Sequence, residues 1–210
     1  MMSYISSCFD ILFPPTKEAL LVRSLTNDTL RTCYKPIKIA STNPKTIALL
    51  DYDDTRVKAL IHQAKFSRDK KAWVCLGEIF SLFLSEEKFS GNALIVPVPL
   101  HKKRYRIRGY NQVLEVLKRV ELPPHAHVRS DILQKKYALK SQVEKDRDAR
   151  RDLPEDLFYV QCKENESLGT VTIFIVDDVI TTGTTLARAI YAFQDVGARD
   201  IRPVALSYKR

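Results

Sequence analysis

The stretch VTIFIVDDVITTGTT, residues 171–185, decides the fold of this 210-residue chain. Its first six residues are β-prone and bounded by polar groups, which is typical of a strand buried on both faces in the middle of a parallel sheet. Asp177 and Asp178 follow at the carboxyl end of this strand, and in an open α/β sheet that end borders the ligand crevice. Two carboxylates there are placed where water, a metal or hydroxyl groups can solvate them, because burial without such partners would be costly.

A hydroxyl-rich turn follows the two acids and opens a helix predicted over residues 186–193. Its members are Thr181, Thr182, Gly183, Thr184 and Thr185. The backbone N–H groups and hydroxyls of such a turn, with the positive end of the following helix, form a cradle for a phosphate. A carboxylate pair followed by a phosphate cradle fits one ligand, phosphoribosyl pyrophosphate (PRPP), whose ribose hydroxyls or metal would meet the acids. The alternative is a strand, an acidic turn and a helix without a ligand, which does not require this combination of residues.

Composition and charge narrow the class of protein. Hydrophobic residues make up 45% of the chain and charged residues 28%, which is typical of a globular domain of ordinary size. A net charge of +9 implies attraction to phosphates, nucleotides, nucleic acid or an anionic membrane. No apolar run is long enough for a membrane span, and the N-terminus lacks the pattern of a secretory signal. The four cysteines form no CxxC pair, so we expect a reduced, cytoplasmic protein without membrane insertion.

Helices alternate with short apolar strands along the rest of the chain. Apolar residues at helical spacing predict two amphipathic helices after residue 49, with Lys65 near the solvent edge of the first. Residues 93–96 predict a buried strand that ends at Pro97-Val98-Pro99, where the chain turns at the edge of the sheet, and residues 201–206 predict a last strand. This alternation predicts an α/β fold with an open, doubly wound, mostly parallel sheet flanked by helices. Residues 1–48 lack strong periodicity and predict a small N-terminal appendage on a main domain of residues 49–210.

Two basic segments stand apart from this pattern. Five of the seven residues 102–108 are basic, and we expect a loop that faces the crevice, because Gly109, Asn111 and Gln112 open a helix over residues 113–120 beside the same strand ends. The alternative is a solvated loop or a general nucleic-acid patch. Residues 129–151 carry eight basic and four acidic side chains, which predicts an exposed, mobile segment. It would be either a surface helix and hairpin or a lid over a polyanion.

Together these segments resemble the ComF family, the phosphoribosyltransferase-like proteins associated with DNA uptake in natural competence. Residues 176–185 are similar to the signature of type I phosphoribosyltransferases. The other matching blocks are Tyr52 through Lys65-Phe66, Val96-Pro97-Val98-Pro99-Leu100, Arg108-Gly109-Tyr110-Asn111-Gln112, and Leu133 through Gln142 with Arg147. The resemblance covers most of residues 49–210 and implies a type I phosphoribosyltransferase fold.

The resemblance also implies roles for individual residues. Asp177 and Asp178 would act on the ribose hydroxyls, directly or through water bound to Mg²⁺, and the hydroxyl-rich turn would bind the 5-phosphate. The residues that would meet the pyrophosphate are Val98, Pro99, Leu100, Lys102, Lys103 and Arg104. A lid or basic surface would comprise Arg108, Asn111, Gln112, Gln142 and Arg147.

The chain departs from the family pattern near its N-terminus. Family members commonly begin with a zinc-binding module built from CxxC pairs, close to a Leu-Phe-Pro sequence. Leu12-Phe13-Pro14 is present here, but only Cys8 and Cys33 lie nearby. Two thiolates without a histidine cannot complete a tetrahedral zinc site. We therefore expect a degenerate module that has lost its zinc and persists as a docking appendage.

Two functions fit these residues. One is Mg²⁺-assisted transfer of a phosphoribosyl group from PRPP to an unidentified acceptor. The other is a non-catalytic component of the transformation machinery that binds PRPP, a nucleotide or single-stranded DNA, with Tyr105 and Tyr110 stacking on bases. A transcriptional regulator on the same fold has less support, because no helix-turn-helix segment is visible. Purine salvage enzymes that use a loop acid as base have an aspartate where this chain has Thr181, so a purine acceptor handled in that way is not expected.

Overall fold

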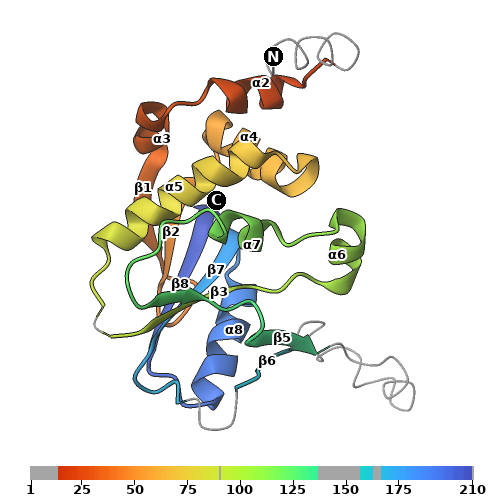
Figure 1. Ribbon diagram of the computed structural model, residues 1–210. Helices are drawn as coiled ribbons and strands as arrows, with labels where there is room; N and C mark the ends of the chain where they lie inside the picture. The colour runs from red at the N-terminus through yellow and green to blue at the C-terminus, as the bar shows by residue number, and fades with distance from the viewer. Residues whose placement is uncertain (1–13, 90, 137–156, 163–166, 210) are drawn as a thin grey trace.

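The computed structural model describes residues 14–89, 91–136, 157–162 and 167–209. They form a six-stranded sheet with helices on both faces and a two-stranded sheet at its side (Figure 1). The strands of the large sheet are β1 (Tyr34–Ile39), β2 (Thr46–Asp51), β3 (Ala93–Pro97), β4 (Ala126–Val128), β7 (Thr172–Ile180) and β8 (Asp200–Tyr208). The small sheet pairs β5 (Leu133–Lys136) with β6 (Leu157–Val160). The helices are α2 (Lys17–Ser24), α3 (Asn27–Cys33), α4 (Thr55–His62), the π-helical turn η1 (Gln63–Ser67), α5 (Lys70–Glu86), α6 (Lys102–Arg108), α7 (Gln112–Leu117) and α8 (Thr184–Asp195).

The large sheet has the strand order β1-β2-β8-β7-β3-β4. Its neighbouring strands are parallel, except that β1 runs antiparallel to β2 at the edge. The expected open, mostly parallel α/β sheet is confirmed. β7 lies between β8 and β3, and β3 lies between β7 and β4, so both strands that lead to the predicted site are interior.

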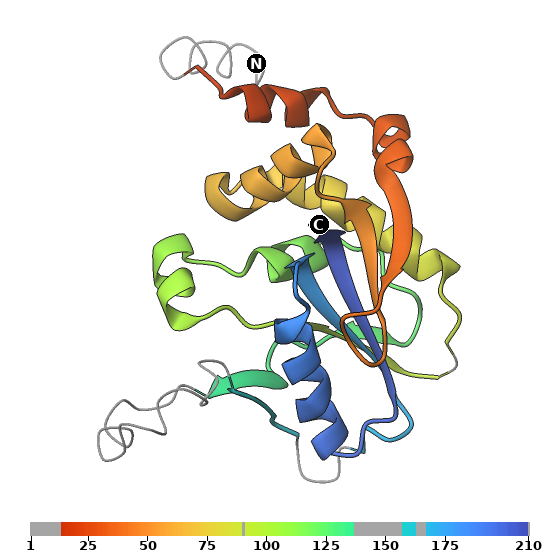
Figure 2. The same cartoon turned by 180° about the vertical axis from the view of Figure 1, so that it is seen from behind.

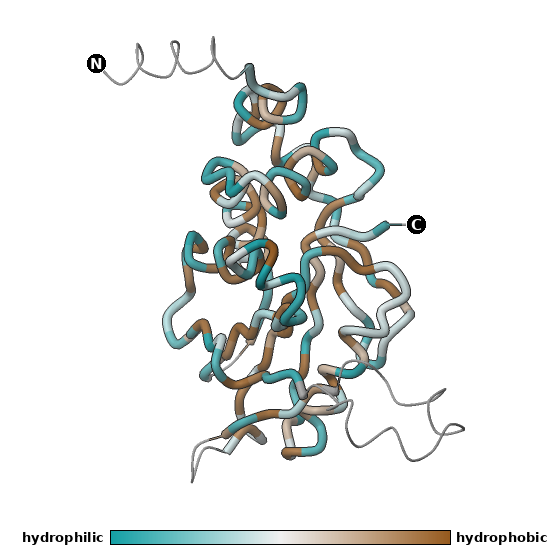
Figure 3. Tube along the Cα trace, turned by 90° about the vertical axis from the view of Figure 1, so that its right-hand side faces the viewer, coloured by the Kyte–Doolittle hydropathy of each residue, from teal (hydrophilic) through white to brown (hydrophobic). Residues whose placement is uncertain are grey.

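Side chains on the two faces of β7 enter two separate cores. Phe174 and Val176 pack in the core that includes α4, α5 and α7, whereas Ile173 and Ile175 pack in the core that includes α8. Alternate residues of a strand point to opposite faces, so a strand covered on both sides needs an unbroken apolar run. Figure 2 shows α8 on one side of the sheet and α4 and α5 on the other. In Figure 3 the turns of these helices alternate between teal and brown, as expected when each buries one face.

Several expected elements differ in extent or type from the observed ones. β7 does not stop before the acids but continues through them to Ile180. The basic loop expected over residues 102–108 is wrong, because these residues form α6, which buries none of its side chains. The helix expected over residues 113–120 is the shorter α7. The expected boundary between residues 48 and 49 falls inside β2, which pairs with β8, so part of the proposed appendage belongs to the main sheet.

The described part of the basic segment 129–151 is partly buried. β5 pairs antiparallel with β6, and Ile132 and Leu133 belong to the same core as residues of α8. The expectation of a largely exposed segment therefore fails for these residues, since two apolar side chains anchor the small sheet. Gln142 and Arg147 lie outside the described residues. No helix in the described ranges has the length and apolar character needed to cross a membrane.

Candidate functional site

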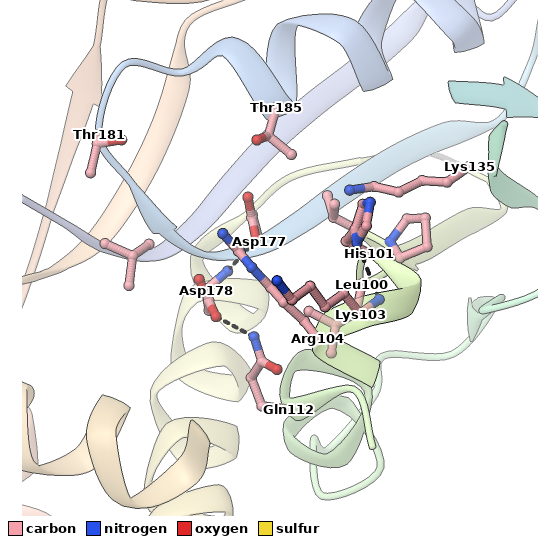
Figure 4. Close-up of a pocket in the computed structure, with 13 residues that line it drawn as sticks. Leu100, His101, Lys103, Arg104, Gln112, Lys135, Asp177, Asp178, Thr181 and Thr185 are labelled. Atoms are coloured by element: carbon pink, nitrogen blue, oxygen red, sulfur yellow. Dashed lines mark hydrogen bonds between the residues drawn. The ribbon is translucent and has the colours of Figure 1, made fainter. Parts of the chain in front are cut away.

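A cavity of about 430 Å³ opens at the carboxyl ends of β3 and β7 (Figure 4). The sheet contributes Asp177, Asp178 and Val179, and the hydroxyl-rich turn with the start of α8 contributes Thr181 and Thr185. The turn after β3 and the start of α6 supply Val98, Pro99, Leu100, His101, Lys103 and Arg104. Gln112 of α7 and Lys135 of β5 complete the lining. The cavity therefore joins segments that are far apart in the sequence at the edge predicted for a ligand.

The two acids are close to each other and unequal in their surroundings. The backbone N–H of Asp178 donates to Asp177 Oδ1 at 2.8 Å. Burial and the negative charge of Asp178 raise the pKa of Asp177, and these effects outweigh the opposing influence of Lys65 and Lys135. Asp178 instead has close cationic and amide partners: Lys65 Nζ lies 3.1 Å from its Oδ2, and the Gln112 amide donates to the same oxygen.

The hydroxyl-rich turn is held against the β1–β2 connection. Gly183 has φ +78° and caps α8 without a side-chain hydrogen bond to the helix. A Cβ atom at Gly183 would lie 3.0 Å from the Ser41 Cβ and 3.2 Å from the Thr42 Cγ2, so both the backbone angle and the close approach favour glycine. The Thr184 N–H at the start of α8 donates to Thr182 Oγ1 at 3.5 Å, and the positive end of this helix suits an anion. Of the five predicted turn residues, Thr181 and Thr185 line the cavity, whereas Thr182, Gly183 and Thr184 do not.

Only some of the residues predicted to bind the pyrophosphate line the cavity. Val98, Pro99, Leu100, Lys103 and Arg104 line the cavity. Lys102, the third basic residue of the predicted set, is not among the residues that line it. His101 and Lys135 line the cavity although the sequence analysis gave neither a role. His101 begins α6, where its Nδ1 accepts a hydrogen bond from the Lys103 N–H at 3.1 Å. No sequence signal pointed to His101, because histidine is not a preferred helix-capping residue and residues 98–100 separate it from the end of β3.

Three residues expected on a lid or basic surface lie within or behind the cavity wall instead. Asn111 Oδ1 caps α7 by accepting from the Val113 N–H at 3.0 Å, and its Nδ2 donates to the Val98 carbonyl at 3.0 Å. Gln112 is buried and contacts Asp178. Arg108 donates to Gln112 Oε1 at 2.9 Å. These residues fix the wall because each bridges two elements, and nothing in their hydrogen bonds resembles a lid.

Lys65 is the functional residue that the sequence analysis misplaced. Helical periodicity puts it near the solvent edge, yet its side chain is only 18% exposed and reaches Asp178. Periodicity measured along one helix cannot reveal a partner on a distant strand. Its place in the family-like block that ends at Phe66 was the available signal.

The acid pair suits a hard cation only in combination with ligand oxygens. Mg²⁺ is usually bound by one or two carboxylates together with substrate phosphates, and Asp177 and Asp178 are such a pair. Within the described ranges no group of three or more His, Cys, Asp or Glu side chains could hold a metal by itself. Cys33 is buried at the end of α3, and Cys8 lies outside the described residues, so the absence of zinc stays a prediction.

Solved structures with a similar trace are phosphoribosyltransferases. Orotate phosphoribosyltransferase from Mycobacterium tuberculosis is 13% identical, with 91% of this chain and 95% of that chain covered at a TM-score of 0.36. Adenine phosphoribosyltransferase from Trypanosoma brucei is 11% identical, with 92% and 81% covered at a TM-score of 0.38. Both scores are below 0.5, so no conclusion depends on these likenesses.

Sequence relatives give the clearer relationship. The competence protein ComFC of Streptococcus pneumoniae is 30% identical over 163 residues, which are 76% of this chain and 66% of that protein. ComFC of Bacillus subtilis is 30% identical over 146 residues, 70% of this chain and 56% of that protein. The chain thus spans less than two thirds of the length of either relative, and no family model matches it. The similarity to both proteins, with the acid pair and the Pro-Val-Pro turn meeting in one cavity, shows that the chain belongs to the ComF family.

Proposed function

We propose that this chain binds PRPP with Mg²⁺ in the cavity and transfers the phosphoribosyl group to an acceptor. One observation carries the proposal: the acid pair shares a single cavity with the hydroxyls of Thr181 and Thr185 and the cations of Lys103 and Arg104 (Figure 4). Phosphate, vicinal diol and pyrophosphate are the three chemical groups of PRPP, and these are the side chains that recognise them.

The roles follow the geometry of the wall. Asp177 and Asp178 accept hydrogen bonds from the ribose hydroxyls, directly or through water on Mg²⁺. The turn of residues 181–185 holds the 5-phosphate at the N-terminal end of α8. Leu100, Lys103 and Arg104 surround the pyrophosphate, with His101 and Lys135 beside them. Lys102 is exposed and contributes only to the field around the cavity mouth.

The transfer needs little covalent chemistry from the protein. The bond from ribose C1 to the pyrophosphate oxygen breaks, its electron pair leaves with pyrophosphate, and the acceptor nucleophile bonds to C1 and loses its proton to solvent or to a base on the acceptor side. Positive charge develops on the ribose and negative charge on the leaving group, so the cations of α6 stabilise the transition state. Mg²⁺, when bound, neutralises further charge on the pyrophosphate.

The acceptor is not a purine deprotonated by the hydroxyl-rich turn. Thr181 lines the cavity where a loop acid would be needed, and a threonine hydroxyl does not accept a proton near neutral pH. An acceptor that is already nucleophilic, such as an amine or an anionic ring, matches this wall better. The acceptor class is part of the proposal and is tested with it.

The test measures binding and turnover separately. We expect PRPP with Mg²⁺ to raise the melting temperature of the chain, and ribose 5-phosphate or pyrophosphate alone to raise it less. Release of pyrophosphate is then followed with amines, pyrimidines and purines as candidate acceptors. A melting temperature that PRPP leaves unchanged at millimolar concentration would refute the proposal, whereas stabilisation without turnover would leave a binding protein.

A second candidate function has one specific observation in its favour. On α6 the side chains of Tyr105 and Ile107 are 53% and 75% exposed among basic neighbours. An exposed aromatic side chain among cations is suited to a single-stranded nucleic acid, since the bases stack and the phosphates are neutralised. Both relatives carry the name of competence proteins, so we propose that this surface serves DNA uptake. Fluorescence titration with labelled single strands tests it, and binding that is independent of salt would refute it.

A further inference from the structure

Lys65 reaches the acid pair because the helix that carries it changes its winding. α4 ends at His62, and residues 63–67 form the π-helical turn η1. A π-helical turn holds more residues than an α-helical turn, so it rotates the following side chains away from their α-helical positions. Such turns occur frequently at functional sites. Lys65 is thereby directed from the expected solvent edge towards the carboxyl end of β7.

The unusual turn is fixed by contacts from two other elements. The Ala64 carbonyl accepts hydrogen bonds from Trp73 Nε1 at 3.1 Å and from the Tyr110 hydroxyl at 2.9 Å. The turn ends at Arg68, which has φ +52° and whose guanidinium donates to the Arg108 carbonyl at 3.0 Å. A strained residue and two side-chain donors on one carbonyl keep η1 in place, because the α-helical hydrogen bond is replaced.

The side chain that η1 brings to the acid pair, Lys65, contacts Asp178. Lys65 Nζ and the Gln112 amide both approach Oδ2 of Asp178, and neither the ammonium nor the carboxylate is more than 18% exposed. An ionised carboxylate has acceptor capacity on both oxygens. Among the described residues, no side chain donates to Asp178 Oδ1. One oxygen is therefore held by the protein, and the other remains for a ligand.

The two side chains that contact Asp178 are linked to each other by further contacts behind the cavity wall. Gln112 accepts from Arg108 at 2.9 Å, and the Arg108 guanidinium lies 4.9 Å from the ring centre of Phe66, the neighbour of Lys65 on η1. Lys65 itself is absent from the residues that line the cavity. It can therefore act on a ligand only through Asp178.

We infer that Lys65 is a positioning residue, whose ammonium fixes the rotamer and charge of Asp178 so that Oδ1 faces a vicinal diol in the cavity. The inference rests on the proposed function, because the diol it serves is the ribose of PRPP. It adds to the site a cation that pairs with Asp178 and does not line the cavity. Residues that orient a ligating carboxylate in this way change ligand affinity by roughly 10- to 100-fold when removed.

The test compares Lys65→Met, Lys65→Arg and the control Lys58→Met. Lys58 lies on the exposed side of α4, so its replacement by methionine removes the same charge without touching the site. The affinity for PRPP with Mg²⁺ is measured by calorimetry. We expect Lys65→Met to weaken it by at least about tenfold, Lys65→Arg to recover part of the loss, and Lys58→Met to bind as wild type.

A double-mutant cycle separates positioning from a general structural defect. In an Asp178→Asn background, Lys65→Met should cause little further loss, because the carboxylate it positions is already gone. Equal loss in both backgrounds would overturn the inference, as would wild-type binding by Lys65→Met. If the wild-type chain itself does not bind PRPP, the proposed function fails and the inference fails with it, a result distinct from the other two.

Discussion

Replacing Asp177 and Asp178 together with asparagine removes both carboxyl groups from the cavity and keeps the size of both side chains. Hydrogen bonds to charged groups contribute about 1.5 to 3 kcal/mol each. Asp177 contributes less than a full charge near neutral pH, since burial and Asp178 raise its pKa. We therefore expect the pair to account for about 2 to 4 kcal/mol of PRPP binding, a loss of roughly 30- to 700-fold in affinity.

Thermal denaturation makes this loss measurable. With PRPP and Mg²⁺ at about 100 times the wild-type Kd, the ligand stabilises the folded wild-type chain by about 2.7 kcal/mol, and the double mutant by less than about 1 kcal/mol. For a chain of this length, 1 kcal/mol corresponds to roughly 2 to 4 °C. The wild-type melting temperature should rise by about 5 to 11 °C, and that of the mutant by less than about 4 °C.

The matched control is Asp53→Asn with Asp195→Asn. Both residues are exposed and away from the cavity, so the double control also replaces two carboxyl groups with amides but does not touch the site. It should be stabilised by PRPP as wild type is. The reasoning is refuted if the cavity mutant retains the full ligand-induced rise, because the acid pair then does not bind the ligand.

Three further outcomes are expected. Replacing Lys102, Lys103 and Arg104 with alanine should weaken PRPP binding. If α6 instead binds a DNA backbone, the same replacement should change the slope of log affinity against log salt concentration by roughly 2 for single-stranded DNA. Full PRPP binding together with a reduced slope would favour the DNA-binding role. The contribution of Asp177 to the free energy of unfolding should fall as pH rises from about 4 to about 7, because Asp177 binds its proton more tightly in the folded chain, where its pKa is about 7, than in the unfolded chain. Asp177→Asn should flatten that fall in denaturant titrations at several pH values, and an unchanged pH dependence would contradict the assignment. The purified chain should hold far less than one zinc per molecule, and a chelator should leave its melting temperature unchanged; one tightly held zinc, found by elemental analysis, would show that the metal module is intact.

Local patterns in the sequence were sufficient for much of the architecture. The apolar run before Asp177 predicted an interior strand, and helical spacing predicted α4, α5 and α8. Both predictions were possible because burial on one or two faces determines the spacing of apolar residues along the chain. Residues 102–108 were wrongly predicted as a loop, because α6 has no buried face to produce a periodic pattern. Its ends are marked only by the His101 cap and by Gly109 at φ +76°.

The sequence likewise predicted one part of the candidate site and not another. By itself, the sequence determined that an acid pair, a hydroxyl-rich turn and a Pro-Val-Pro turn would meet at one edge of a parallel sheet, because the carboxyl ends of parallel strands share that edge. Only the tertiary structure decided which cation stands behind the acids. The ion pair of Lys65 with Asp178 depends on a π-helical turn, on the hydrogen bonds to Ala64 and on the packing of α4 against the sheet. These are contacts between distant segments, and a side chain's partner across such a distance is set by packing, which leaves no periodic trace in the order of residues.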